Sequence, residues 1–136
     1  MAKRNLNCDW KQYYKDHLIS IDDAVDKLQD GDVVYLGQAT MIPLTFLDLI
    51  HEKKEQFKNL SFWYNVMSGP ANMVFDHDSR EHFHLKSIYQ LPIERMGVDE
   101  HTLEFLGSGY DQYEYCLWEN GVNTSAITYC PPNENG

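Results

Sequence analysis

The sequence predicts an α/β protein with an open, mostly parallel sheet and flanking helices. Two hydrophobic runs, residues 33–36 and 60–67, are rich in β-branched and aromatic side chains, as buried strands are. Residues 42–56 lie between them and repeat their apolar side chains at helical spacing. A strand, a helix and a second strand in succession favour parallel strands joined by right-handed crossovers. The 136 residues suffice for one domain with a hydrophobic core.

Two short helices are expected before the first strand. Residues 10–17 place three aromatic side chains and His17 at helical spacing, and Asp9 precedes them as an N-cap. Ser20 and Asp23 resemble a capping box, with Asp in place of the usual Glu. This box predicts a second helix over residues 21–28, which ends before the turn at Gly31.

The chain after residue 67 gives weaker signals. Residues 72–83 are mixed and polar, and they predict no regular structure. The next segments predict a strand at 85–89, a helical turn or loop at 92–100, a strand with one wet face at 101–106, a helix at 110–118 and a final strand at 125–130. Pro131 and Pro132 stop that last strand, because proline cannot donate to a strand ladder.

The bend after the first strand is the first candidate site. Gly37 frees the backbone for a sharp turn, Thr40 is a potential helix N-cap, and Pro43 fits a first helical turn. In open α/β sheets, ligands bind beyond the carboxyl ends of strands, where helix N-termini offer free N–H groups. Gly37, Gln38, Ala39, Thr40 and Pro43 are therefore expected to contact a ligand. An ordinary strand-to-helix connection is the alternative.

A second junction is expected beside that bend. Ser68 and Gly69 end the second predicted strand, and parallel neighbouring strands would bring this junction next to the first. Ser68 and Gly69 therefore join the candidate binding residues.

Charge and composition restrict the class of partner. The net charge of −10 argues against broad electrostatic binding to nucleic acid or to an anionic membrane. No segment is long and apolar enough to span a bilayer, and the N-terminus lacks the apolar run of a signal peptide. Three widely spaced cysteines without a CxxC motif suit reduced thiols. We therefore expect a cytoplasmic protein.

Other chemistries have weaker support. His77, His82 and His84, with Asp76 or Asp78, could hold a metal, but their spacing matches no common ligand pattern. A solvated loop before a strand is the favoured interpretation, and no bound metal is expected. Buried, inert thiols are expected at Cys116 and Cys130, and a core position at Trp63. Neither the GxGxxG nor the GxxxxGK[ST] nucleotide motif occurs.

Several segments, taken in order, resemble class I CoA-transferases. The likeness is closest to the branch with acetyl-CoA hydrolases and 4-hydroxybutyrate or butyrate:acetate CoA-transferases. It rests on Trp10 and Tyr13, on residues 20–25, on the Gly-Asp-hydrophobic-Gly-x-Ala-x-x-x-Pro pattern of residues 31–43, on residues 53–60, and on residues 126–136 with their Pro-Pro-Asn-Glu-Asn-Gly end. Gln38 and Met41 are bulkier than the family's usual residues, which leaves the substrate class open.

The resemblance implies an activity and a set of partners. Family members move CoA between an acyl-CoA and a free carboxylate, through a glutamate that becomes a glutamyl-CoA thioester. Coenzyme A is a substrate there, and no tightly bound cofactor is implied. Residues 37–43 would correspond to the family's substrate loop, and Pro131, Pro132 and Asn133 would lie near the same cleft. A homo-oligomer is also expected.

The resemblance covers the family's N-terminal part only. No glutamate of this chain matches the nucleophile's motif, so residues 1–136 would form an N-terminal domain with no catalytic residue of its own. A complementary C-terminal half or partner chain would supply the nucleophile, and this chain would be inactive alone. The alternative is a non-catalytic, transferase-like interaction module.

Overall fold

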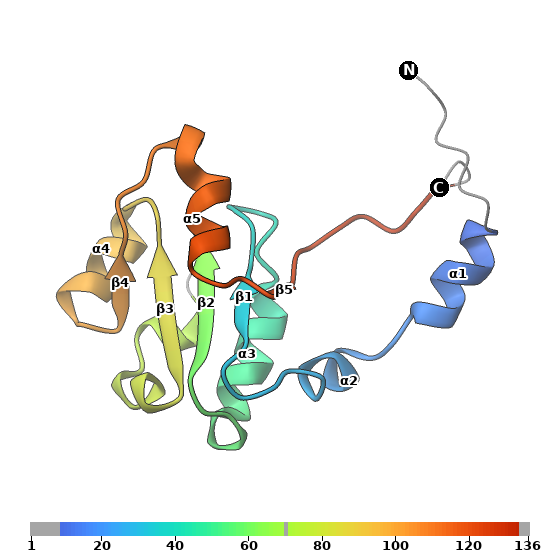
Figure 1. Ribbon diagram of the computed structural model, residues 1–136. Coiled ribbons are helices and arrows are strands. Elements are labelled where there is room, and N and C mark those ends of the chain that lie inside the picture. Colours follow the sequence, from blue (N-terminus) through green and yellow to red (C-terminus); the bar gives the residue numbers. More distant parts are fainter. Residues whose placement is uncertain (1–8, 70, 134–136) are drawn as a thin grey trace.

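The computed structural model describes residues 9–69 and 71–133, and within them one open sheet has the strand order β4-β3-β2-β1-β5 (Figure 1). All four neighbouring strand pairs are parallel. The predicted α/β class is therefore confirmed. The strands are β1 (Val33–Tyr35), β2 (Leu60–Tyr64), β3 (Phe83–Ser87), β4 (Leu103–Phe105) and β5 (Thr124–Ser125).

The described helices precede the first strand or connect successive strands. The α-helices are α1 (Trp10–His17), α2 (Ile21–Val25), α3 (Leu44–Glu52), α4 (Pro92–Asp99) and α5 (Tyr113–Glu119). Short 3₁₀ turns are η1 (Lys54–Gln56), η2 (Asn72–Val74), η3 (His77–Glu81) and η4 (Tyr110–Gln112). Both N-terminal caps were predicted correctly: Asp9 accepts from the Lys11 N–H at 3.0 Å, and Ser20 exchanges hydrogen bonds with Asp23.

The strand order explains which face each helix covers. The first four strands advance in one direction across the sheet, so right-handed connections place α3 and α4 on one face. The connection from β4 to β5 runs back across the sheet, and α5 accordingly lies on the opposite face, where Tyr113 meets Tyr35 edge-on at 5.8 Å between ring centroids. The core lies on the α3 face, where Leu47 and Ile50 pack with Phe62.

Several element boundaries differ from the prediction. The last strand ends at Ser125 instead of continuing to residue 130, because its one partner, β1, ends at Tyr35. The third strand begins at Phe83, two residues earlier than expected, and pairs along the whole of β2. Residues 92–99 form a regular helix with Pro92 in its first turn, where a missing N–H costs nothing.

Helix α1 lies away from the core, whereas Trp63 is buried in it. None of the residues in α1 is buried, and α1 stands apart from the sheet at the end of an extended linker (Figure 1). Trp63 is 1% exposed and is thus a core residue, as expected, with the Lys86 ammonium 5.5 Å from its ring. In the part of the chain described, no helix has the length and hydropathy to cross a bilayer.

Candidate functional site at the carboxyl edge of the sheet

The bend after β1 is a tight loop that backbone hydrogen bonds close. Gly37 is buried and has a φ of 81°, in the left-handed region that favours glycine. The next residues close a turn, since the Met41 N–H donates to Gln38 O at 2.9 Å and the Ile42 N–H donates to Ala39 O at 3.2 Å. This turn uses the residues up to Ile42, so α3 starts later than predicted.

The predicted cap at Thr40 is wrong. The helix begins at Leu44, and Pro43 occupies the N-cap position, where no side chain accepts a hydrogen bond from the first turn. Thr40 is exposed on the turn instead. Without a side-chain cap, the first N–H groups of α3 are left to other acceptors.

The second strand-to-loop junction lies directly against the bend, as predicted. Ala39 and Met67 form a parallel bridge, and the Ala39 N–H donates to Val66 O at 2.7 Å. The Ser68 hydroxyl donates to Ala39 O at 3.2 Å. Ser68 is exposed, and Gly69 lies behind it against the Leu44 side chain. The two loops thus form one continuous wall at the carboxyl ends of β1 and β2.

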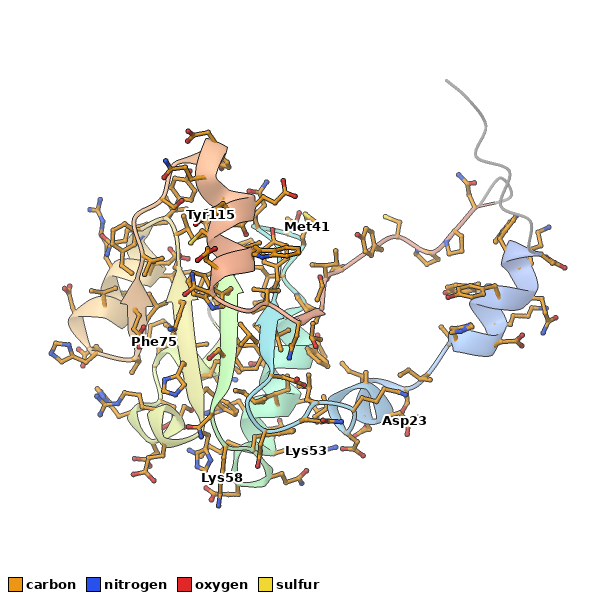
Figure 2. All side chains as sticks on the ribbon, viewed as in Figure 1. Asp23, Met41, Lys53, Lys58, Phe75 and Tyr115 are labelled. Carbon is orange, nitrogen blue, oxygen red and sulfur yellow. The ribbon has the colours of Figure 1, made fainter. Side chains whose placement is uncertain are left out.

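The segment after β5 closes the other side of the bend. The Thr128 N–H donates to Met41 O at 2.7 Å (Met41 is labelled in Figure 2), and a Cβ built on Gly37 would lie 3.1 Å from Ile127 Cγ2. Contact with the bend is therefore made by Ile127 and Thr128, at the point where the chain leaves the sheet.

The residues near the C-terminus that were expected beside the bend do not lie there. Pro131, Pro132 and Asn133 are exposed on the extended segment that leads away from the sheet (Figure 1). Residues 134–136 of the same predicted loop lie outside the described residues. The physical reason is the short β5: after its ladder with β1 ends, the Thr128 N–H still donates to Met41 O, and the residues that follow lead away from the sheet.

The outer surface of the bend presents polar groups. Gln38 and Thr40 are exposed, and their backbone N–H groups have no acceptor among the described residues. The Gln38 side chain accepts a hydrogen bond from Asn65 Nδ2 at 3.0 Å. Asn65 is 2% exposed, and its Oδ1 has no described partner. The exposed residues of the edge therefore carry two backbone donors without a described acceptor, and one unpartnered amide oxygen is buried beneath them.

Asn65 and Glu94 were not identified from the sequence. Asn65 lay inside a predicted strand, although a polar residue at the end of an aromatic run was a usable signal. Glu94 is 0% exposed, and its carboxylate accepts from the Met67 N–H at 2.8 Å and the Leu91 N–H at 3.0 Å. It ties α4 to the loop after β2. Both of its oxygens are occupied, so it holds the loop in place and is not available as a nucleophile.

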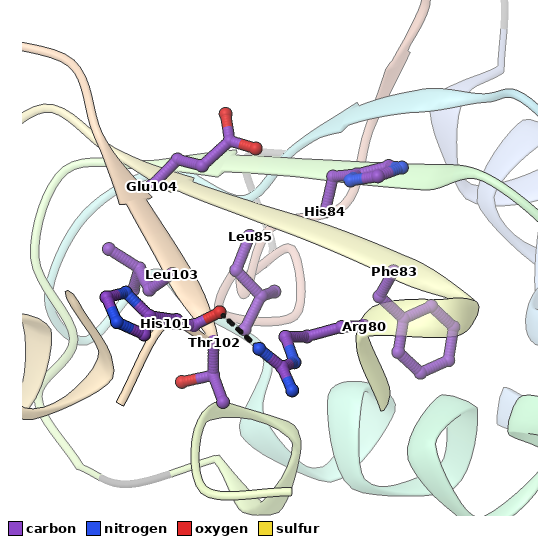
Figure 3. A pocket seen from close by; sticks show the side chains of 8 residues that line it. All are labelled: Arg80, Phe83, His84, Leu85, His101, Thr102, Leu103 and Glu104. Atoms are coloured by element: carbon purple, nitrogen blue, oxygen red, sulfur yellow. Dashed lines mark hydrogen bonds between the residues drawn. The ribbon is translucent and has the colours of Figure 1, made fainter. Parts of the chain in front are cut away.

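A cavity with several polar side chains lies away from this edge. Arg80, His84, His101 and Glu104 line a cavity of about 210 Å³ near the amino ends of β3 and β4 (Figure 3). The guanidinium donates to His101 O at 3.4 Å, so it is partly committed to the backbone. No group of three His, Cys, Asp or Glu side chains that could hold a metal occurs in residues 9–69 and 71–133. The histidine-rich segment is a 3₁₀ turn followed by a strand.

Asp76, which lies in that segment, has a structural role: its carboxylate binds side chains from three neighbouring elements. Its Oδ2 accepts from Lys54 Nζ at 2.6 Å, lies 2.7 Å from His51 Nε2, and accepts from the Ser79 hydroxyl at 3.0 Å. The Lys54 ammonium and then His51 hold the pKa of this carboxyl well below its ordinary value. The cluster joins α3 and η1 to η3.

The prediction that both cysteines are buried is wrong. Cys130 is exposed and Cys116 is half-buried, and both are free thiols.

Comparisons with known proteins match the fold. RipA from Yersinia pestis superposes with a TM-score of 0.80 over 95% of this chain and 32% of that chain, at 17% identity. A structure of a methionine-to-glycine mutant of RipA gives a TM-score of 0.81 at 16% identity, with the same coverage. The chain spans about a third of the length of these structures. Neither a family model nor a curated protein sequence matches it.

Proposed function

We propose that this chain is the substrate-loop portion of an enzyme that moves CoA from an acyl-CoA to a carboxylate, or hydrolyses the acyl-CoA. The observation that carries the proposal is the bend at residues 37–43. It lies at the carboxyl edge of a parallel sheet, where α/β proteins bind ligands, and its exposed residues Gln38 and Thr40 have backbone N–H groups with no acceptor among the described residues. The order of the segments that resemble class I CoA-transferases supports the same function.

The chemistry assigned to the bend is electrostatic. Attack on a thioester carbonyl develops negative charge on its oxygen, and fixed backbone N–H groups stabilise that charge without reorganising. The Gln38 and Thr40 N–H groups supply such donors, and the contacts of Ala39 with Val66 and of Met41 with Thr128 hold the bend in place.

The nucleophile is assigned to polypeptide outside this chain. Glu94 is the carboxylate tied to this edge, and it is buried with both oxygens engaged. The similar structures are about three times as long as this chain, which is consistent with a second part that completes the cleft. The proposal therefore expects binding without turnover.

Amide-resolved NMR tests this proposal with the chain as it exists. Acetyl-CoA added to the ¹⁵N-labelled chain should shift the Gln38 and Thr40 amide signals, while residues around the Arg80 cavity serve as the internal control. Shifts confined to other regions, or no shifts at saturating acetyl-CoA, would contradict the assignment of the bend. Intact-mass measurement with acetyl-CoA and acetate should show no covalent CoA adduct. An adduct on this chain would mean that it carries the nucleophile itself.

The second candidate is a non-catalytic, transferase-like interaction module. It is favoured by the large side chains that are exposed on α1, α5 and the segment after β5, including Tyr13 at 58%, Trp118 at 82% and Tyr129 at 74%. A chain that binds no acetyl-CoA and forms a stable assembly through these side chains would favour the module.

A further inference from the structure

Helix α5 presents a surface that combines aromatic and acidic side chains. Tyr115 is 67% exposed and Trp118 is 82% exposed, on one side of the helix (Tyr115 is labelled in Figure 2). Together with Asp111, Glu114 and Glu119 they line a shallow hollow of about 430 Å³. We call these five residues the acidic-aromatic face. None of its three carboxylates forms an ion pair with another described residue.

The sequence around this face carries one sign of charge. Residues 96–136 contain no Lys or Arg, and their carboxylates are Asp99, Glu100, Glu104, Asp111, Glu114, Glu119 and Glu134. This part of the sequence therefore supplies no Lys or Arg that could neutralise the face. An exposed Trp beside unpaired carboxylates is suited to a cationic partner, because Lys or Arg can both pair with the acids and lie over the indole ring.

The opposite end of the chain has the complementary character. The arm, defined as residues 9–19, contains α1 and the exposed Leu18 and Ile19. Lys11 and Lys15 are one helical turn apart and so lie on the same side of α1, with Tyr14 between them. Residues 1–19 contain four cations, Lys3, Arg4, Lys11 and Lys15, and two acids, Asp9 and Asp16, of which Asp16 accepts a hydrogen bond from Gln12 at 2.6 Å.

The arm has no partner within the described part of its own copy. None of the residues of α1 is buried, and its side-chain hydrogen bonds stay within the helix and its cap. An isolated helix of eight residues is marginal in water, since helix nucleation is costly. Packing on another surface would stabilise it.

We propose that the arm of one copy docks on the acidic-aromatic face of a second copy, in a two-fold symmetric dimer that exchanges both arms. Lys11 and Lys15 pair with Glu114 and Glu119, and the arm's apolar side chains cover Trp118. Two-fold symmetry forms the same contact twice, so each arm strengthens the binding of the other. The dimer does not depend on the CoA-transferase proposal.

Sedimentation equilibrium tests the proposal through a charge swap. Glu114→Lys with Glu119→Lys should weaken the dimer about tenfold or more, because attraction at two pairs becomes repulsion. Adding Lys11→Glu with Lys15→Glu should restore the dissociation constant to near that of the unmodified chain. Raising NaCl from about 0.1 M to about 1 M shortens the screening length from about 10 Å to about 3 Å, and should weaken the unmodified dimer as well.

Matched controls separate specific docking from a general effect of charge. Glu52→Lys with Glu81→Lys changes the net charge equally at exposed positions away from both surfaces, and should leave the dimer unchanged. Trp118 is largely exposed, so Trp118→Ala should weaken the dimer and leave the thermal unfolding temperature unchanged. A monomer at every concentration would overturn the proposal. So would a dimer that is insensitive to the α5 reversals, or reversals that the arm substitutions fail to rescue.

Discussion

Gly37 and Gly31 form a matched pair that tests the geometry of the bend. They lie at opposite ends of β1 and have nearly the same backbone conformation, with φ of 81° and 84°. A Cβ at Gly31 would meet nothing within 4 Å. A Cβ at Gly37 would lie 3.0 Å from Met41 Cβ and 3.1 Å from Ile127 Cγ2. Substituting Ala at each position therefore separates backbone strain from contact with the neighbouring segments.

The expected losses can be worked from these distances. Left-handed backbone costs alanine about 1–2 kcal/mol, and the reduced freedom of the unfolded chain offsets about 0.4–1 kcal/mol of this. Gly31→Ala should therefore lower the free energy of unfolding by about 1 kcal/mol. Gly37→Ala adds overpacking of about 1–3 kcal/mol, for a total of about 2–4 kcal/mol.

Urea unfolding followed by circular dichroism measures the difference. With a slope of about 1–3 kcal/mol per molar urea, the Gly37→Ala midpoint should lie about 1 M below that of Gly31→Ala. Hydrogen exchange at the Thr128 amide should also accelerate in the Gly37 variant alone, because the clash pushes the crossing segment off the bend. Equal midpoints and unchanged exchange at Thr128 would refute the view that this segment closes the bend.

Three further outcomes follow from the charged and buried groups. Lys54 chiefly holds the pKa of Asp76 below its unfolded value, so this carboxylate stabilises the fold at a pH above the unfolded pKa. That stabilisation is lost as the pH falls through the lower folded pKa. Asp76→Asn should therefore flatten the decline in unfolding free energy below about pH 5. Glu94→Gln should cost about 1–3 kcal/mol in urea unfolding and speed amide exchange in the loop after β2, since one buried N–H loses its charged acceptor; unchanged exchange would contradict its role as a tie. Burial raises the pKa of Tyr64 and of Tyr113, so absorbance at alkaline pH should show both ionising only as the chain unfolds, whereas early ionisation of all tyrosines would argue against their burial.

Local patterns were sufficient where neighbours in the chain determine the conformation. The caps at Asp9 and Ser20 use hydrogen bonds within three residues, and both helices begin where these residues predict. The buried runs of β1 and β2 identified a parallel sheet, because only strands covered on both faces are so continuously apolar. The candidate bend was predicted as residues 37–43 for the same reason, from a glycine directly after a buried strand.

Boundaries set by partners were not predictable in this way. The end of β5 depends on where β1 stops, and α3 starts late because the turn at residues 38–42 bridges to Met67. The Asn65–Gln38 pair and the Glu94–Met67 bond each join residues 27 positions apart, so no local pattern reports them.

The sequence by itself determined the fold class, the early helix caps and the position of the glycine bend, since each depends on side-chain periodicity or on bonds between near neighbours. Tertiary structure alone decided which part of the C-terminal segment meets that bend. It brought Thr128 there and left Pro131 to Asn133 outside, because backbone pairing between distant segments, and not residue type, fixes where a chain leaves a sheet.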